Sequence, residues 1–265
     1  MQNDFKLIVH KFDKDITIYP ISDVHLGSLE HNKEEWEKFV EVLQSEPNSY
    51  VILGGDLLNN ATKSSVSNVY EDIIRPMEQK ELMTKYLEPI KHKILCAVSG
   101  NHERRSKKEV DLDPIYDIMC KLNLEHLYRE NVAFMKIMIG TPEDIKKRKN
   151  VAFTFAVTHG TGGGAVGASV NRNELFGYTI DNLDCLVTGH THKGAVTKPA
   201  KIYIDTRNNT VTLKPFTVIT SQSWLSYGGY AMHRMLKPAA NASVSNGQKI
   251  LLTGRNGRKQ LNVYW

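Results

Sequence analysis

Five short apolar runs in this sequence are each followed at once by small or metal-binding residues, and this repeated junction restricts the fold more than any other feature. The runs cover residues 16–21, 50–53, 93–98, 151–158 and 183–188. Short apolar runs bounded by turn residues are typical of buried β-strands. Amphipathic segments separate several of the runs, and strands that alternate with helices predict an α/β fold.

The amphipathic segments predict where the helices lie. In residues 32–47, the apolar side chains Trp36, Phe39, Val40 and Leu43 recur on one helical face. Helices are also expected over residues 66–91, with an interruption near Pro76, and over residues 113–122. Further strands are expected at residues 131–139, 201–206, 210–220, 249–253 and 260–265.

The composition is that of an ordinary globular protein. Apolar residues make up 41% and charged residues 24% of the 265 residues, which excludes collagen-like and disordered classes. No stretch approaches the ~18 consecutive apolar residues that a membrane span needs, and the N-terminal segment is too charged for a signal peptide. The three cysteines form no CxxC pair, which argues against a disulfide framework or a zinc finger. We therefore expect a cytoplasmic protein with no membrane partner.

The residues that follow the apolar runs can bind metal ions. They are Asp23, His25, Asp56, Asn101, His102, His159, His190 and His192. Ligands of α/β sheets bind at the carboxyl ends of the strands, so these distant segments can converge on one site. Mixed oxygen and imidazole ligands suit Mn²⁺, Fe²⁺ or Zn²⁺. The set is too large for one ion, whereas two ions about 3.5–4 Å apart that share a carboxylate would use it, an arrangement suited to in-line displacement at phosphorus.

At these residues the sequence resembles the calcineurin-like metallophosphoesterases. The resemblance lies in Asp23-x-His25, Gly55-Asp56, Gly100-Asn101-His102-Glu103, His159-Gly160 and Gly189-His190-x-His192, in that order. It spans residues 23–192, and any one block alone would be weak evidence. It implies a four-layer αββα sandwich of two mixed sheets flanked by helices. It also implies a metal-dependent phosphoric ester hydrolase.

The resemblance further implies a role for each residue. Asp23, His25 and His192 would hold one metal ion, and Asn101, His159 and His190 a second. Asp56 would bridge the two ions, and a hydroxide between them would be the nucleophile. His102 would steady the phosphoryl oxygens or protonate the leaving group. The cofactors would be two divalent ions, with Mn²⁺ expected and Fe or Zn as alternatives.

The substrate is less constrained than the chemistry. The net charge of +5 and the paired Arg104 and Arg105 beside the third motif favour phosphodiesters or nucleic acid; the alternative is that these arginines are a solvated helix start. Arg172 is a further candidate for substrate contact, with helix capping and solvation as its alternative. Trp224 and nearby tyrosines could stack on a base or belong to the core. The expected partner is a phosphate-ester substrate.

Two other functions stay open on the sequence. One is a phosphomonoesterase for proteins or small molecules, although Ser99 stands where protein phosphatases carry an arginine before Gly-Asn-His. The other is a metal-binding scaffold without turnover. We expect one domain over residues 1–265, with a β-rich part at 193–265 that sets specificity. The sequence leaves the oligomeric state open.

Overall fold

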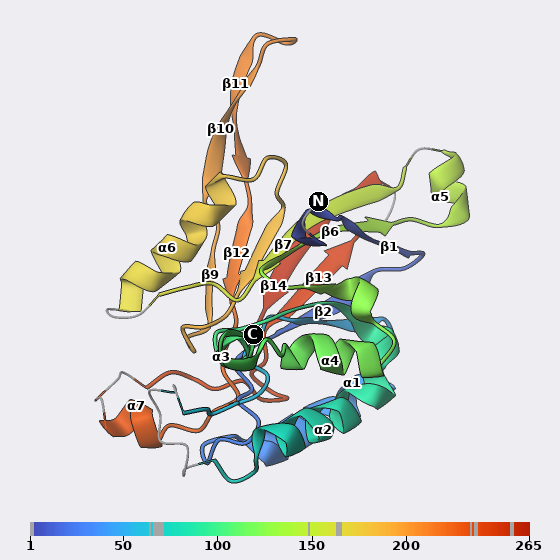
Figure 1. The fold of residues 1–265 in the computed structure, drawn as a ribbon. Coiled ribbons are helices and arrows are strands. Elements are labelled where there is room, and N and C mark those ends of the chain that lie inside the picture. The colour runs from blue at the N-terminus through green and yellow to red at the C-terminus, as the bar shows by residue number, and fades with distance from the viewer. Residues whose placement is uncertain are drawn as a thin grey trace.

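Two six-stranded mixed sheets form the centre of the molecule, and helices cover their outer faces (Figure 1). The computed structural model describes residues 3–63, 65, 72–147, 149–162, 166–233, 235, 238–254 and 257–265. Sheet I has the strand order β1-β6-β7-β8-β12-β9, and sheet II has the order β14-β13-β2-β3-β4-β5. Parallel and antiparallel neighbours occur in both. The expected four-layer αββα architecture is confirmed.

The strands fall into these two sheets and one separate hairpin. Sheet I contains β1 (Ile8–Phe12), β6 (Val132–Ile139), β7 (Val151–Thr158), β8 (Cys185–Thr188), β9 (Ala195–Thr197) and β12 (Thr217–Thr220). Sheet II contains β2 (Ile16–Ile21), β3 (Ser49–Leu53), β4 (Ile94–Val98), β5 (Tyr128–Arg129), β13 (Lys249–Thr253) and β14 (Gln260–Tyr264). The hairpin consists of β10 (Ala200–Asp205) and β11 (Thr210–Pro215). The five apolar runs are therefore strands, as predicted.

Helices cover each sheet on its outer side (Figure 1). The α-helices are α1 (Lys33–Ser45), α2 (Pro76–Leu87), α3 (Glu103–Val110), α4 (Pro114–Lys121), α5 (Pro142–Lys146), α6 (Val166–Tyr178) and α7 (Gly229–His233). Short 3-10 helices are η1 (Asn3–Phe5), η3 (Glu88–Lys93) and η4 (Glu125–Leu127). Helices α1, α2 and α4 lie on sheet II, whereas α6 lies on sheet I (Figure 1).

Helix α1 follows directly from its sequence. The Asn32 side chain accepts a hydrogen bond from the Glu35 N–H and caps the first turn. All four predicted apolar residues of its inner face are buried. The prediction for the next helix is corrected, because α2 begins at Pro76 and is not interrupted there. Proline suits the first helical position, where its missing N–H costs no hydrogen bond. The earlier part of that prediction, residues 66–71, lies outside the described residues.

The elements that were not predicted include β1, α3 and α6. Strand β1 carries polar residues and lies at the edge of sheet I, so its apolar signal is weak. Helix α3 is almost wholly polar. Helix α6 is glycine-containing and of low amphipathicity, but Phe176 and Ile180 at its end pack on a cluster of sheet I that includes Leu186 and Val218. Tertiary packing therefore decides α6 against its weak local preference.

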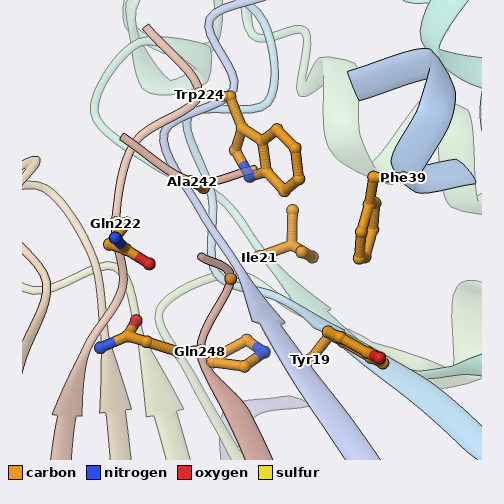
Figure 2. Close-up of a pocket in the computed structure, with 9 residues that line it drawn as sticks. Tyr19, Ile21, Phe39, Gln222, Trp224, Ala242 and Gln248 are labelled. Carbon is orange, nitrogen blue, oxygen red and sulfur yellow. The ribbon is translucent and has the colours of Figure 1, made fainter. Parts of the chain in front are cut away.

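One apolar cluster extends from Ile8 to Leu252 and joins residues of both sheets. Trp224 is buried in it against Trp36 and Phe39, so its ring belongs to the core and is not a base-stacking surface. Beside Trp224 lies a cavity of about 10 Å³, room for about one water molecule (Figure 2). Within the described part of the chain, no helix is long and apolar enough to cross a membrane.

Candidate metal centre

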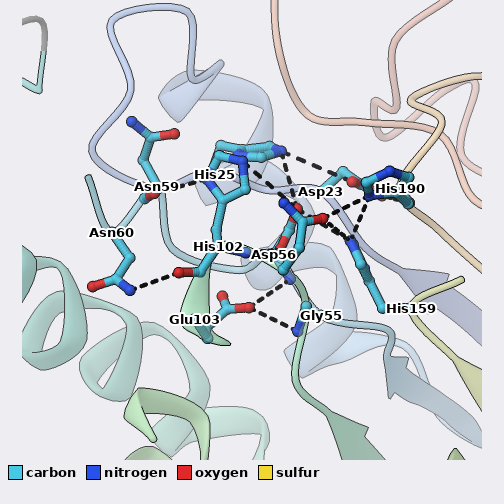
Figure 3. Close-up of polar contacts among 12 residues, drawn as sticks. Asp23, His25, Gly55, Asp56, Asn59, Asn60, His102, Glu103, His159 and His190 are labelled. Carbon is cyan, nitrogen blue, oxygen red and sulfur yellow. Dashed lines mark hydrogen bonds and ion pairs between the residues drawn. The ribbon is translucent and has the colours of Figure 1, made fainter. Parts of the chain in front are cut away.

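The predicted metal-binding side chains meet at the carboxyl ends of β2, β3, β4, β7 and β8 (Figure 3). They form three overlapping groups whose ligand atoms lie within 4.8 Å of one another. The groups are Asp23, His25 and His192; His25, Asp56 and His102; and Asp56, His159 and His190. Asn101 joins the last group, since its Oδ1 lies 2.6 Å from His190 Nδ1 and 3.0 Å from His159 Nε2. Asp56 thus stands between two clusters of donors.

The backbone turns sharply at these residues. Asp23, His25, Asp56, His190 and His192 all have positive φ values, between 49° and 69°. Non-glycine residues rarely adopt this left-handed conformation, and such strain gathers at functional sites. The turn after each strand brings side chains that are two residues apart in sequence to one point. The ordinary alternation of a strand would spread them along one face.

Two glycines permit the close approach of these turns. A Cβ at Gly189 would lie 1.9 Å from Ser22 Oγ and 2.7 Å from Asp23 Oδ2. A Cβ at Gly100 would lie 2.0 Å from Asp56 Oδ1. All three distances are too short for a real Cβ atom. The lack of space for a side chain therefore explains why the motifs have glycine at these two positions.

Asp23 and Asp56 each accept hydrogen bonds at one carboxylate oxygen and turn the other oxygen toward the imidazoles. Asp23 Oδ2 accepts hydrogen bonds from Ser22 Oγ at 2.6 Å and from the His190 N–H at 2.9 Å. Its Oδ1 is buried and receives no hydrogen bond from the described residues, although His192 Nε2 lies 3.2 Å away. Asp56 repeats this arrangement: its Oδ1 accepts from the His102 N–H at 2.8 Å.

The free oxygen of Asp56 faces three imidazoles. Its Oδ2 lies 3.1 Å from His159 Nε2 and 3.9 Å from the Nε2 atoms of both His25 and His102. His159 donates from Nδ1 to the Gly54 carbonyl at 2.9 Å, so its Nε2 is turned toward the site. A backbone contact of this kind commonly orients a histidine that binds metal.

The buried charges change the proton affinities of these groups. Burial raises the pKa of the Asp56 carboxyl, but the nearby His159 and His102 imidazoles outweigh it and bring the pKa well below its usual range. Burial lowers the pKa of His159, but Asp56 opposes this more strongly and raises the pKa to about 10. For His102, burial and the adjacent His25 lower the pKa to about 3. The carboxylate is thus held in its charged form.

This donor set fits divalent cations. A buried carboxylate oxygen with no donor, a second one surrounded by ring nitrogens, and an amide oxygen all point inward together. His25 Nε2 and His192 Nε2 lie 3.1 Å apart, a contact that only one proton can occupy. Oxygen and imidazole donors together suit borderline divalent ions, and no cysteine is among them.

Glu103 is a site residue whose role the sequence did not reveal. It is fully buried, and its carboxylate accepts the backbone N–H groups of Asp56 at 3.0 Å, Leu58 at 3.0 Å and Gly100 at 2.9 Å (Figure 3). It therefore joins the turns that follow β3 and β4. Asn60 supports the same region, since its side chain donates to the His102 carbonyl at 2.7 Å. The Gly-Asn-His-Glu motif is the only sequence signal for Glu103, and it does not show which groups the carboxylate binds.

The predicted substrate contacts lie in different places. Arg105 Nη2 donates to His102 Nε2 at 3.0 Å, and so faces the site. Arg104 donates to the carbonyls of Ser99 and Glu130, each at 3.4 Å. Arg172 is exposed on α6. Of the three arginines, Arg105 has a direct contact with a residue of the cluster.

A sequence model of calcineurin-like phosphoesterases matches residues 16–194, more than half of the chain. The protein belongs to this family. This membership confirms the resemblance found in the motifs. The matched segment contains all five motif blocks and ends just after His192.

Comparison with individual proteins adds more distant similarities. The chain is 25% identical over 137 residues to the DNA polymerase II small subunit of Thermoplasma acidophilum, a match that covers 49% of this chain and 27% of that protein. It therefore spans about a quarter of that relative. Among solved structures, a predicted phosphoesterase of Streptococcus pneumoniae has a TM-score of 0.37 at 10% identity and covers 94% of this chain and 98% of its own. A cold-active protein tyrosine phosphatase has a TM-score of 0.35 at 12% identity, covering 98% and 81%.

Proposed function

We propose that this calcineurin-like phosphoesterase hydrolyses phosphodiesters, with nucleic acids as its substrate class. One observation carries the two-cation part of this proposal: Asp56 groups with His159 and His190 on one side and with His25, a member of the Asp23 group, on the other. A carboxylate between two donor clusters suits two-metal phosphoryl chemistry. The proposal goes beyond the family in naming two ions and a diester substrate.

In this proposal, Asp23, His25 and His192 would hold one cation, and Asn101, His159 and His190 would hold the other. Asp56 would contribute to both sites, and Mn²⁺ is the ion that we expect. When bound, such ions lower the pKa of coordinated water to ~7 and neutralise charge on the phosphoryl oxygens. The protein contributes a fixed set of donors, because buried hydrogen bonds orient both carboxylates before any ion arrives.

We assign to His102 the task of positioning Arg105, whose guanidinium would hold a phosphoryl oxygen. His102 donates from Nδ1 to the Asn59 carbonyl at 2.7 Å and accepts from Arg105 at Nε2. In this arrangement neither ring nitrogen of His102 has a proton to offer to a leaving group, which favours a role through Arg105 over protonation of the leaving group. The guanidinium adds the positive charge that a phosphate diester attracts.

The diester preference rests on charge and on a relative. The net charge is +5, and Arg105 stands beside the cluster. The similarity to a DNA polymerase II small subunit points in the same direction, although it covers 27% of that protein. We also propose that the chain is one domain, since residues 193–265 supply strands to both sheets. Substrate specificity would then come from loops of residues 193–265 that lie beside the site. One is the loop at Trp224, whose backbone N–H donates to the Asp23 carbonyl.

The test compares a diester with a monoester. Protein treated with a chelator is assayed on bis-p-nitrophenyl phosphate and on p-nitrophenyl phosphate, each with Mn²⁺, Fe²⁺ or Zn²⁺ added back. We expect the diester to be cleaved faster and Mn²⁺ to restore the highest rate. Single- and double-stranded DNA and RNA then serve as substrates, with salt titration of binding as a second readout.

Each result of this test has a separate meaning. A higher rate on the monoester would replace the proposal by a phosphomonoesterase. Cation binding without hydrolysis of either ester would favour a metal-binding scaffold. Cleavage of the model diester, with neither cleavage nor salt-sensitive binding of nucleic acids, would retain the phosphodiesterase and remove nucleic acid as its substrate.

A further inference from the structure

Two buried glutamine oxygens face the small cavity beside Trp224. Gln222 and Gln248 are each 4% exposed, and both line this cavity of about 10 Å³ (Figure 2). Neither Oε1 atom accepts a hydrogen bond from a described residue. A buried acceptor without a donor has lost its contact with solvent and gained nothing in return, which is costly. These two oxygens therefore mark a place in the core where a donor is needed.

The nitrogen atoms of the two amides fix which way the oxygens point. Gln222 Nε2 donates to the Ala240 carbonyl at 3.2 Å and, more weakly, to the Asn241 carbonyl at 3.5 Å. Gln248 Nε2 donates to the Thr220 carbonyl at 3.1 Å. Turning either amide over would lose a hydrogen bond and place its oxygen against a carbonyl oxygen. Both oxygens are thus held away from these carbonyls, and in Figure 2 they are turned toward each other.

The size and the walls of the cavity restrict what can stand between the two oxygens. Two acceptors require a species that donates two hydrogen bonds or carries positive charge. The walls include the apolar side chains of Ile21, Phe39 and Ala242. Hard cations take about six or more oxygen ligands, far more than two amides supply. A cavity of about 10 Å³ has room for one water molecule, which carries two donor hydrogens.

We propose that one water molecule is part of the folded core at this cavity. It donates one hydrogen bond to Gln222 Oε1 and the other to Gln248 Oε1. Buried waters of this kind make about two to four hydrogen bonds to polar groups that otherwise lack a partner. The site is separate from the metal centre and takes a neutral donor in place of a cation.

The water joins two segments of the C-terminal part. Gln248 lies directly before β13, which pairs with β2 in sheet II. Gln222 lies two residues before Trp224, whose backbone N–H donates to the Asp23 carbonyl at 3.0 Å. The segment that supports the Asp23 turn is thereby connected to sheet II through a hydrogen-bonded water.

Oxygen-17 relaxation dispersion tests the proposal in solution, because it counts the water molecules that exchange slowly from a protein. Gln248→Met keeps an unbranched side chain of similar length, but its thioether is only a weak acceptor. We expect this variant to hold one slowly exchanging water fewer than the native chain. Gln260→Met is the same change at an exposed position of β14 and should leave the number unchanged.

A crystal structure of the native chain, at a resolution that shows ordered water, locates the molecule. We expect one peak at about 2.5–3.0 Å from both Oε1 atoms. An empty cavity would overturn the proposal, and so would a peak that rubidium replaces, since a monovalent cation would then occupy the site.

An unchanged number of slowly exchanging waters in Gln248→Met would also overturn the proposal. Circular dichroism checks that the variant folds. Gln222→Met removes the other acceptor and should lose the same water, so the test does not depend on a single variant. None of these readouts depends on the proposed hydrolase activity or on bound divalent cations.

Discussion

The two ends of the β8–β12 strand pair both depart from the usual pattern of buried apolar and exposed polar side chains. One end buries charged side chains, and the other exposes apolar ones. At the carboxyl end, charged and polar side chains are buried together, among them Asp23, Asp56 and His159. At the other end, the hairpin of β10 and β11, called the arm below, exposes the aliphatic side chains of Ile202, Ile204, Val211 and Leu213. Burying charge and exposing apolar surface are both costly for an isolated chain. The difference between the two ends is that cations can balance the buried charges of the metal centre, whereas the described residues leave the aliphatic side chains of the arm exposed.

The greatest change in kcat is expected when an aspartate of the metal centre is replaced by asparagine, and the same replacement in the arm is its control. Asp56→Asn should lower kcat by more than about 10²-fold, the upper range for loss of a group that only supports a ligand. It should also reduce the bound metal, since an amide is a weaker ligand than a carboxylate. Asp205→Asn at the tip of the arm should leave both unchanged. Kinetics and elemental analysis check this; two ions still bound to the Asp56→Asn protein would contradict the bridging role.

A smaller effect is expected at His102. His102→Ala should retain the metal ions and lower kcat on the order of 10²-fold, as for other groups that stabilise charge in the transition state. Steady-state kinetics with metal analysis of the same sample would measure it. An unchanged kcat would show that His102 only holds the loop at Asn59.

Glu103→Gln tests whether the site is held together by its buried carboxylate. The amide offers one acceptor oxygen, so at least one of the three N–H groups now bound would lose its partner. We expect a loss of about 1–3 kcal/mol in the free energy of unfolding. Glu125→Gln, at an exposed position, is the matched control. Denaturant unfolding measures both, and equal stabilities would mean that Glu103 does not support the turns.

The smallest effect is expected in the arm. Ile219→Ala, in the buried part of β12, should cost about 2–5 kcal/mol of stability. Ile204→Ala should cost less than about 0.5 kcal/mol, because its side chain packs on little within one chain. A large loss at Ile204 would show that the arm packs on its own chain.

Much of the fold could be predicted because it depends on local sequence patterns. Apolar runs, caps and turn residues act over a few positions, and they placed β2, β3, β4, β7 and β8 and the residues that follow them. The start of α2 was predicted less well, since Pro76 can begin a helix or interrupt one. Helix α6 was missed because its contacts with sheet I, and not its own residues, stabilise it.

Local sequence patterns were enough to predict which residue types gather at the strand ends, because parallel strands carry their final residues to a common edge. The folded chain was needed to see which oxygen of Asp23 and Asp56 faces the imidazoles, that Glu103 joins two turns, and that Arg105 rather than Arg104 reaches His102. It alone also revealed that the arm stands apart from both sheets. The physical reason is the same in each case: these properties depend on contacts between residues far apart in the chain, about which the local pattern carries no information.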